Sequence, residues 1–385
     1  MKRTHKEKGL NIFVNRLLGS IKRIQRVEQP GYIKIKKANF PDRHFRKYIK
    51  ENFDKDNDNI LSSDEINNIT KIGVVHNQNI TSLQGIEHFP NLMSLTCVQT
   101  GITELDVSKN TALTSLDCYD NKELTRLILD GANALTTLNC YSTGITELDV
   151  SNNTALTNLD CSNTGITELD VSKNTALRGL TCWNTGITEL DVSKNTALTW
   201  LGCSNTRITS LDVSKNTELT ALYCDSIGIT ELDVSKNTAL TDLWCYNTGI
   251  TELDVSKNTA LTELWLDNTG ITSLDVSKNT ELKLLIAENN DLAWFNIGDN
   301  QNLYVSIDDS NIDLGEVVGT FNIEEVFPGI ELNRITMKSG AILDKTTGIV
   351  SNYVNGTPIR YSYDCSTSFH GAETLEVTLT FHVDM

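Results

Sequence analysis

The sequence of 385 residues lacks any apolar run that approaches the roughly 18 residues needed to cross a bilayer, which excludes a membrane-spanning helix. It also lacks a phosphate-binding loop, a His-Glu-x-x-His motif and a serine nucleophile elbow. None of the 6 histidines lies between Cys97 and Asn290, where the repeats described below are most regular, and Cys365 with His370 is the only Cys/His pair close in sequence. We therefore predict that the protein is not an enzyme.

Positive charge is scarce outside the N-terminus. Residues 1–50 contain 15 Lys and Arg against 3 Asp and Glu, whereas the other 335 residues contain 18 against 47. Binding to nucleic acid depends on basic side chains that neutralise phosphates. The acidic body therefore disfavours DNA or RNA as a partner.

The basic N-terminal arm, residues 1–38, has the pattern of an amphipathic helix. Its apolar residues share one helical face, namely Leu10, Phe13, Val14, Leu17, Leu18, Ile21 and Ile24. This pattern fits either a helix docked on the body or a helix that contacts a membrane surface. The arm also begins like a secretory leader, but Asn15 and Arg16 interrupt its apolar stretch.

One segment recurs along most of the chain. Residues 177–197 read LRGLTCWNTGITELDVSKNTA, and the leucine of ITELDV or its equivalent returns every 21 residues, apart from two steps of 22. One such unit cannot bury its own apolar side chains, so neighbouring units must stack into a continuous core. The unit resembles the leucine-rich repeat, with cysteine in its third leucine position, over residues 78–305. We predict an α/β-type repeat solenoid dominated by parallel β-strands, a leucine-rich-repeat solenoid of about ten to eleven coils.

The apolar positions of a unit indicate which side chains face the core. Alternation along the strand points Leu180 and Cys182 inward and residues 179, 181 and 183 outward. The following segment should bury Ile187, Leu190 and Val192. The segment SKNT is expected to form a turn in which asparagine adopts a left-handed conformation.

Most of the cysteines occupy one inward position of consecutive repeats, at Cys97, Cys118, Cys140, Cys161, Cys182, Cys203, Cys224 and Cys245. Leu266 and Ala287 fill this position in the next two coils, so it accepts small apolar groups in general. Stacked side chains lie about 4.8 Å apart, farther than the roughly 3.8 Å that a disulfide prefers between Cβ atoms. We therefore predict core packing rather than a metal site or a disulfide ladder.

An aspartate follows the inward leucine of nearly every ITELDV segment, as Asp191 does, and a lysine such as Lys194 follows three residues later. The aspartates stack like charges, which the lysines relieve. We predict a solvated face, with a cation-binding strip as the alternative.

Residues 39–77 precede the repeats and contain DKDNDNILSSDE, which resembles a calcium-binding EF-hand loop. The resemblance implies a structural Ca²⁺ ion with ligands from Asp54, Asp56, Asp58, the carbonyl of Ile60, Ser62 through water, and Glu65. Asn59 stands where the motif has glycine, and asparagine tolerates the positive φ required there. The alternative is an acidic turn that ends a helix.

The period fails after residue 305, and residues 306–385 contain alternating strand-like segments. We predict a small β-rich module that closes the end of the solenoid. The order of EF-hand-like segment, repeats and β-rich tail resembles secreted or surface-displayed bacterial leucine-rich-repeat proteins, broadly of the internalin type. The resemblance implies recognition of a partner and an extracellular or cell-surface location. Without an effective leader, the location would be cytoplasmic.

From Cys97 to Asn290 the aromatic residues occupy only outward strand positions, at Tyr119, Tyr141, Trp183, Trp200, Tyr223, Trp244, Tyr246 and Trp265. Such strands line the concave face of leucine-rich-repeat folds, and rigid aromatic side chains are typical of binding hot spots. Random drift would also alter the exposed positions of ITELDVSKNTA, which hardly vary. We predict a non-enzymatic recognition module that binds a protein or glycan on this face. The alternatives are packing between neighbouring strands and, for the whole protein, a structural spacer or self-assembling surface array.

Overall fold

The computed structural model describes residues 31–298, 300, 303–308, 310–316, 320–353, 357–364 and 374–382. The helix predicted in the basic arm, together with Cys365 and His370, lies outside the described residues. The chain divides into two compact units, Met1–Leu156 and Thr157–Met385. No helix in the described ranges is long and apolar enough to span a bilayer.

In the described part of the first unit, a segment with two short helices precedes the coils. Helix α2 (Arg43–Phe53) starts after Asp42, whose carboxylate accepts hydrogen bonds from two backbone amides of the first turn. Helix α3 (Ser63–Asn67) begins with a capping box formed by Ser62 and Glu65. Between the helices, β2 (Ile60–Leu61) pairs with β1 (Ile33–Lys34) in antiparallel orientation. The buried rings of Phe40 and Phe89 lie 6.1 Å apart and join this segment to the first coils.

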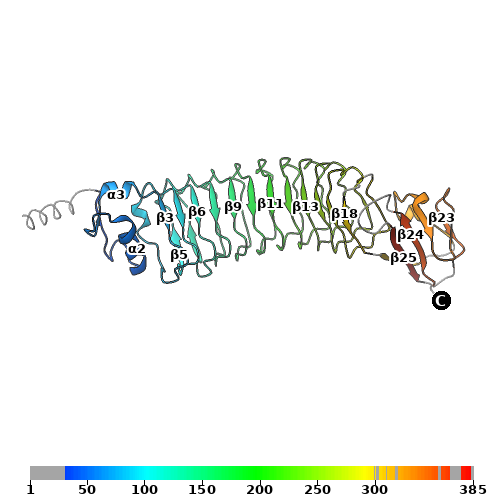
Figure 1. Cartoon of the computed structure of the whole chain (residues 1–385), viewed down its shortest axis with the longest axis horizontal. Coiled ribbons are helices and arrows are strands. Elements are labelled where there is room, and N and C mark those ends of the chain that lie inside the picture. Colours follow the sequence, from blue (N-terminus) through cyan, green and yellow to red (C-terminus); the bar gives the residue numbers. More distant parts are fainter. Residues whose placement is uncertain are drawn as a thin grey trace, which may run out of the picture. The chain divides into compact units, whose positions relative to one another are not determined.

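The coils of the first unit follow directly. Strands β3 (Lys71–Gly73), β4 (Ser94–Thr96), β6 (Ser115–Asp117) and β8 (Thr137–Asn139) pair in parallel in this order. The pairs join equivalent residues of successive repeats, such as Leu95 with Leu116. Figure 1 shows strands β3 and β6 side by side in one row with their neighbours. A second pair, β5 (Glu104–Asp106) and β7 (Arg126–Ile128), connects the ITELDV segments, and in the preceding coil the 3-10 helix η1 (Ile86–His88) follows the equivalent segment, residues 80–85.

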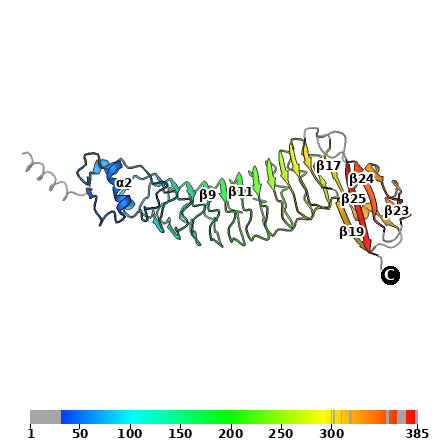
Figure 2. The same cartoon turned by 60° about the horizontal axis from the view of Figure 1, so that its bottom comes forward.

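The second unit continues the same pattern. Its parallel strands, side by side in Figures 1 and 2, are β9 (Asn158–Asp160), β10 (Gly179–Thr181), β11 (Trp200–Gly202), β12 (Ala221–Tyr223), β13 (Asp242–Trp244), β14 (Glu263–Trp265), β16 (Leu284–Ile286) and β18 (Tyr304–Ser306). Strands β15 (Ser273–Asp275) and β17 (Trp294–Asn296) pair in the ITELDV segments of the last coils. The coiled, parallel fold predicted from the repeat is confirmed.

The inward positions form the predicted core. Leu180, Cys182, Ile187 and Val192 are fully buried, and Leu190 is buried. All eight repeat cysteines have no exposed surface and carry free thiols. Their prediction as core side chains is therefore confirmed.

The conformation predicted for the SKNT asparagines is wrong. The left-handed residues instead lie directly after the strands, where Asn184 has φ 53° and Asn205 has φ 53°. The SKNT asparagines are fully buried. The Nδ2 group of Asn237 donates to the carbonyls of Asn216 (2.8 Å) and Val213 (3.0 Å), and the equivalent asparagines of neighbouring coils repeat this arrangement. Buried carbonyls need hydrogen-bond donors, so the position selects asparagine for its amide rather than for its backbone freedom.

The C-terminal residues form the predicted β-rich module. One sheet contains β19 (Ser310–Glu316), β25 (Thr374–His382), β24 (Ile359–Asp364) and β21 (Ile335–Met337), and a second contains β20 (Phe321–Asn322), β23 (Ile349–Ser351) and β22 (Ile342–Leu343). The short helices α4 (Ile323–Val326) and η2 (Leu332–Arg334) lie between β20 and β21 in the sequence. The hydroxyl of buried Tyr361 donates to the carbonyl of Ala293 (3.0 Å), which ties this module to the last coils of the second unit.

Candidate functional site

The outward side chains of strands β9–β18 form one surface of the second unit, here called the strand face. Because parallel strands pair in register, equivalent residues of successive coils form columns, and successive residues in one column lie about 4.8 Å apart. Three columns run across the coils, one from the residue before each central leucine, one from the residue after it and one from the third residue after it. Around Leu243 these residues are Asp242, Trp244 and Tyr246.

Five aromatic side chains of the strand face contact one another across four neighbouring coils. This aromatic cluster contains Trp200, Tyr223, Trp244, Tyr246 and Trp265. Adjacent ring centroids lie 4.8 Å apart for Trp200 and Tyr223, 4.6 Å for Tyr223 and Trp244, and 5.2 Å for Trp244 and Trp265. The interplanar angles of these three pairs are 80°, 50° and 40°, so the rings pack edge to face or tilted rather than flat.

The aromatic side chains differ in exposure. Trp200 is 42% exposed at one edge of the cluster, whereas Tyr223, Trp244, Tyr246 and Trp265 are half-buried. The indole N–H groups of Trp244 and Trp265 are buried and find no acceptor among the described residues. The cluster is therefore partly a packing unit and partly an open surface.

The remaining predicted residues make none of the ring contacts found among the described residues. Trp183 belongs to the strand face and is 41% exposed, but it follows β10, one coil before Trp200. Tyr119 and Tyr141 are half-buried in coils of the first unit. The ring contacts found among the described residues thus join five of the eight side chains predicted from the sequence.

Carboxylates flank the aromatic cluster on both sides. Asp242 and Glu263 lie in the column before the central leucines, and they pair in register on β13 and β14. On the other side the third column carries Asp225, Asp267 and Glu288. Between Asn158 and Asp308, none of the outward positions in the three columns holds lysine or arginine.

These carboxylates change the ionisation of their neighbours. Burial raises the pKa of Tyr246 to about 12, and the charge of Asp225 and the hydrogen bond that Tyr246 makes to it contribute to this shift. Burial raises the pKa of Tyr223, and the charges of Asp242 and Glu263 raise it further. Burial also raises the pKa of Asp267 against its backbone hydrogen bonds, with smaller contributions from the charges of Glu288 and Asp308. The strand face thus carries crowded negative charge next to aromatic rings.

The EF-hand-like loop brings three carboxylates together. Oxygen atoms of Asp54, Asp56 and Asp58 lie within 4.8 Å of one another. Asp54 is nearly buried and accepts hydrogen bonds from the amides of Asp58 (3.1 Å) and Asn59 (3.0 Å). Asn59 has φ 64°, the positive value expected at this position. Three converging hard oxygens fit the chemistry of a calcium site.

Glu65 and Ser62 are bonded to each other in this loop. The carboxylate of Glu65 accepts hydrogen bonds from the backbone amides of Lys55 and Ser62 and from the Ser62 hydroxyl, each at 2.8 Å. Burial raises the pKa of the Asp54 carboxyl, and the charges of Asp58 and Asp56 add to this against two backbone hydrogen bonds. The cap of α3 therefore engages Ser62 and Glu65, while Asp54, Asp56 and Asp58 form the acidic turn that follows α2.

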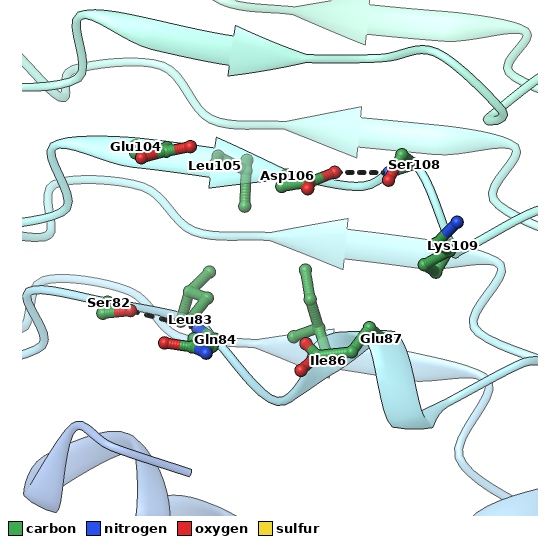
Figure 3. Close-up of a pocket in the computed structure, with 10 residues that line it drawn as sticks. All are labelled: Ser82, Leu83, Gln84, Ile86, Glu87, Glu104, Leu105, Asp106, Ser108 and Lys109. Atoms are coloured by element: carbon green, nitrogen blue, oxygen red, sulfur yellow. Dashed lines mark hydrogen bonds between the residues drawn. The ribbon is translucent and has the colours of Figure 1, made fainter. Parts of the chain in front are cut away.

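A pocket of about 410 Å³ lies elsewhere, between two consecutive coils of the first unit (Figure 3). Its carboxylates already have partners. Asp106 accepts from the amide of Ser108 (2.8 Å), Glu87 from the amide of Gly85 (2.6 Å), and Glu104 pairs with Arg126 (2.6 Å). Its polar groups thus serve the local turns and an exposed ion pair.

No protein-family model and no curated protein sequence matches this chain. Among solved structures, it is similar to the internalin InlF of Listeria monocytogenes, at 22% identity and a TM-score of 0.57, over 72% of this chain and 91% of that chain. Listeria monocytogenes InlP is similar at 17% identity and a TM-score of 0.50, over 92% of this chain and 99% of that chain. The functional domain of InlJ from the same species, described as including a cysteine ladder, is 27% identical with a TM-score of 0.48, over 91% and 99% of the two chains. The chain therefore has an internalin-like leucine-rich-repeat fold.

Proposed function

We propose that the chain is a non-enzymatic recognition module whose strand face in the second unit binds a protein or glycan partner. The observation that carries the proposal is the aromatic cluster, in which five rings contact one another. All five occupy outward positions of the coils, whereas the inward positions that form the core hold other side chains. Covering apolar surface contributes about 2.5 kcal/mol per 100 Å². Rings held by their neighbours also lose little side-chain entropy on binding.

The curvature of leucine-rich-repeat solenoids supports the proposal. Because the strands lie on the concave side of such folds, a partner seated there would contact several coils at once. Outward residues of neighbouring strands would then act together, with the half-buried rings as the centre and the polar columns as the rim.

The test compares binding by the full chain and two double variants. A screen of glycans and candidate surface proteins identifies binders, and each binder is then titrated against the wild type, Trp244→Ala/Trp265→Ala and Trp244→Phe/Trp265→Phe. We expect the alanine variant to lose at least about tenfold in affinity, and the phenylalanine variant to retain more because it keeps the rings. Circular dichroism and melting control for folding. Equal affinity of all three proteins for every binder would refute the proposal, and a mass that rises with concentration in light scattering would favour the self-assembling array instead.

We also propose that the EF-hand-like loop binds one structural Ca²⁺ ion through Asp54, Asp56 and Asp58. The convergence of their oxygens within 4.8 Å and the positive φ of Asn59 support this second proposal. The ion would offset two of the three negative charges in the turn that follows α2. Direct binding by Glu65 would require its carboxylate to give up hydrogen bonds of the helix cap.

Calorimetric titration of the full chain with CaCl₂ tests the site. We expect one binding event and a higher melting temperature in the wild type, and neither in Asp58→Asn. Asp64→Asn is the matched control because it removes an exposed carboxylate from the adjacent helix outside the cluster. No heat in the wild type, with an unchanged melting temperature, would refute calcium binding.

We further propose an extracellular or cell-surface location, which rests on the internalin-like fold and the order of segments. Labelling of intact cells with a membrane-impermeant reagent tests it. Protection of the protein until the cells are lysed would contradict an exposed location.

A further inference from the structure

We infer that the strand face recognises a basic protein segment, whose arginine or lysine side chains lie on the aromatic cluster between the two columns of carboxylates. This inference rests on the proposed function and narrows the partner from a protein or glycan to one chemistry.

The rings provide the first part of the site. A cation within about 6 Å of a ring centroid is attracted to the ring face, most strongly for tryptophan. The centroids of Tyr223, Trp244 and Trp265 follow one another at 4.6 and 5.2 Å across three coils. One guanidinium or ammonium group on this column therefore reaches two rings at once.

The flanking carboxylates provide the second part. Residues two apart in a strand have Cα atoms about 6.6 Å apart and point to the same face. Asp242 thus lies beside Trp244, and Glu263 beside Trp265, in the same strands. A basic side chain over either ring would meet a carboxylate on its own strand, which makes the contact both cation–π and ionic.

The face has no basic side chain of its own to balance this charge. The three columns carry Asp160, Asp225, Asp242, Glu263, Asp267, Glu288 and Asp308 without lysine or arginine. Asp225 accepts hydrogen bonds from Ser204 and Tyr246, and Asp267 accepts one from the backbone amide of Glu288 (3.2 Å), while the charges of Glu288 and Asp308 repel Asp267. The crowding costs free energy that a bound cation would relieve.

The same charges distinguish the candidate partners. A neutral glycan could stack on the rings, but binding it would remove water from several carboxylates without supplying a positive charge. An acidic glycan would be repelled. A basic protein segment satisfies the rings and the carboxylates together, which is why the observations favour it.

The experiment measures binding of a fluorescent peptide of alternating arginine and glycine to the full chain by anisotropy. A peptide with citrulline in place of arginine has nearly the same shape and no charge. We expect the arginine peptide to bind more tightly than the citrulline peptide, and its affinity to fall as salt is raised.

Variants locate the binding site. Asp242→Asn/Glu263→Gln and Trp244→Ala/Trp265→Ala should each weaken the arginine peptide by at least about fivefold. Glu231→Gln/Glu252→Gln should leave its affinity unchanged, because it removes the same charge from exposed ITELDV positions in coils of the same unit. If both carboxylate variants lost the same affinity for the arginine peptide, net charge alone would explain the attraction, and the inference would be overturned. Equal affinity of the arginine and citrulline peptides for the wild type would overturn it as well.

The outcomes also separate the inference from the proposed function. If the tryptophan variant loses a glycan or neutral protein found by the screen while the arginine peptide fails to bind at low salt, the recognition face stands and the basic partner is refuted. If the tryptophan variant binds every probe as the wild type does, both are refuted.

Discussion

The buried asparagine ladder of the second unit allows a stability prediction that separates hydrogen bonding from packing. Asn237 is fully buried, and its Nδ2 group donates to the carbonyls of Asn216 and Val213 in the preceding coils. Asn237→Ala removes the amide, whereas Asn237→Asp keeps its shape and removes both donors. Thr238→Ala is the control, because Thr238 is the exposed next residue of the same turn.

The magnitude follows from what each carbonyl retains. The carbonyl of Val213 also accepts from the amide of Asn216 (2.9 Å), and that of Asn216 from the amide of Leu219 (3.1 Å), so neither is left without a donor. Two lost hydrogen bonds and a small cavity should then lower the free energy of unfolding of Asn237→Ala by about 2–4 kcal/mol. An ionised aspartate would face carbonyl oxygens with no donor of its own, so we expect about 3–5 kcal/mol for Asn237→Asp at neutral pH.

Urea unfolding followed by tryptophan fluorescence measures these effects in the relevant unit, because all 5 tryptophans lie between Trp183 and Trp294. The pH dependence adds a second check. Burial should raise the pKa of the introduced carboxyl group, so Asn237→Asp should recover stability relative to the wild type as pH falls and the acid regains a donor. A loss in Asn237→Ala no larger than in Thr238→Ala, or an aspartate variant as stable as the wild type at neutral pH, would refute a stabilising role for the ladder.

Three further predictions follow from individual groups. Burial, with a smaller contribution from Asp160, raises the pKa of the Cys182 thiol to about 12. Alkylation of Cys182 near pH 8 should therefore be far slower in the native protein than in urea. Rapid labelling of the native protein, detected by mass spectrometry, would contradict the buried position. Backbone hydrogen bonds from the serines two residues later lower the pKa of Asp191 and Asp212 below the usual 3.8. Their stabilisation should be complete above that value and lost as pH falls through the lowered pKa, so Asp191→Asn/Asp212→Asn should lose less stability on acidification than the wild type, as measured by urea midpoints. Tyr361→Phe removes the hydrogen bond to Ala293 and should cost about 1–3 kcal/mol in urea unfolding; a change indistinguishable from zero would rule out that bond as a stabilising tie.

The repeat made the coils predictable. When the same 21 residues recur, each strand meets an equivalent strand, and the register of Leu222 with Leu243 follows from the period itself. The same logic identified the cysteine column as core, because Leu266 and Ala287 occupy its later positions and are also buried. It also identified the outward aromatic positions from which the cluster is built.

Other features depend on neighbours that no periodic pattern describes. Residue preference alone predicts left-handed turns at the SKNT asparagines, whereas their role comes from hydrogen bonds to carbonyls of preceding coils. In the C-terminal module the sequence indicates strands, but the parallel pairing of Ser310 with Val377 joins segments that do not repeat, so nothing in their spacing selects it.

The sequence by itself determined the coil, its parallel strands and the side of the coil on which the aromatic residues lie, because translation by a fixed period carries every residue to an equivalent place. Only the tertiary structure decided which rings touch and which carboxylates flank them. Ring contacts and charge crowding depend on side-chain positions across several coils, and these positions vary from coil to coil where the repeat itself does not.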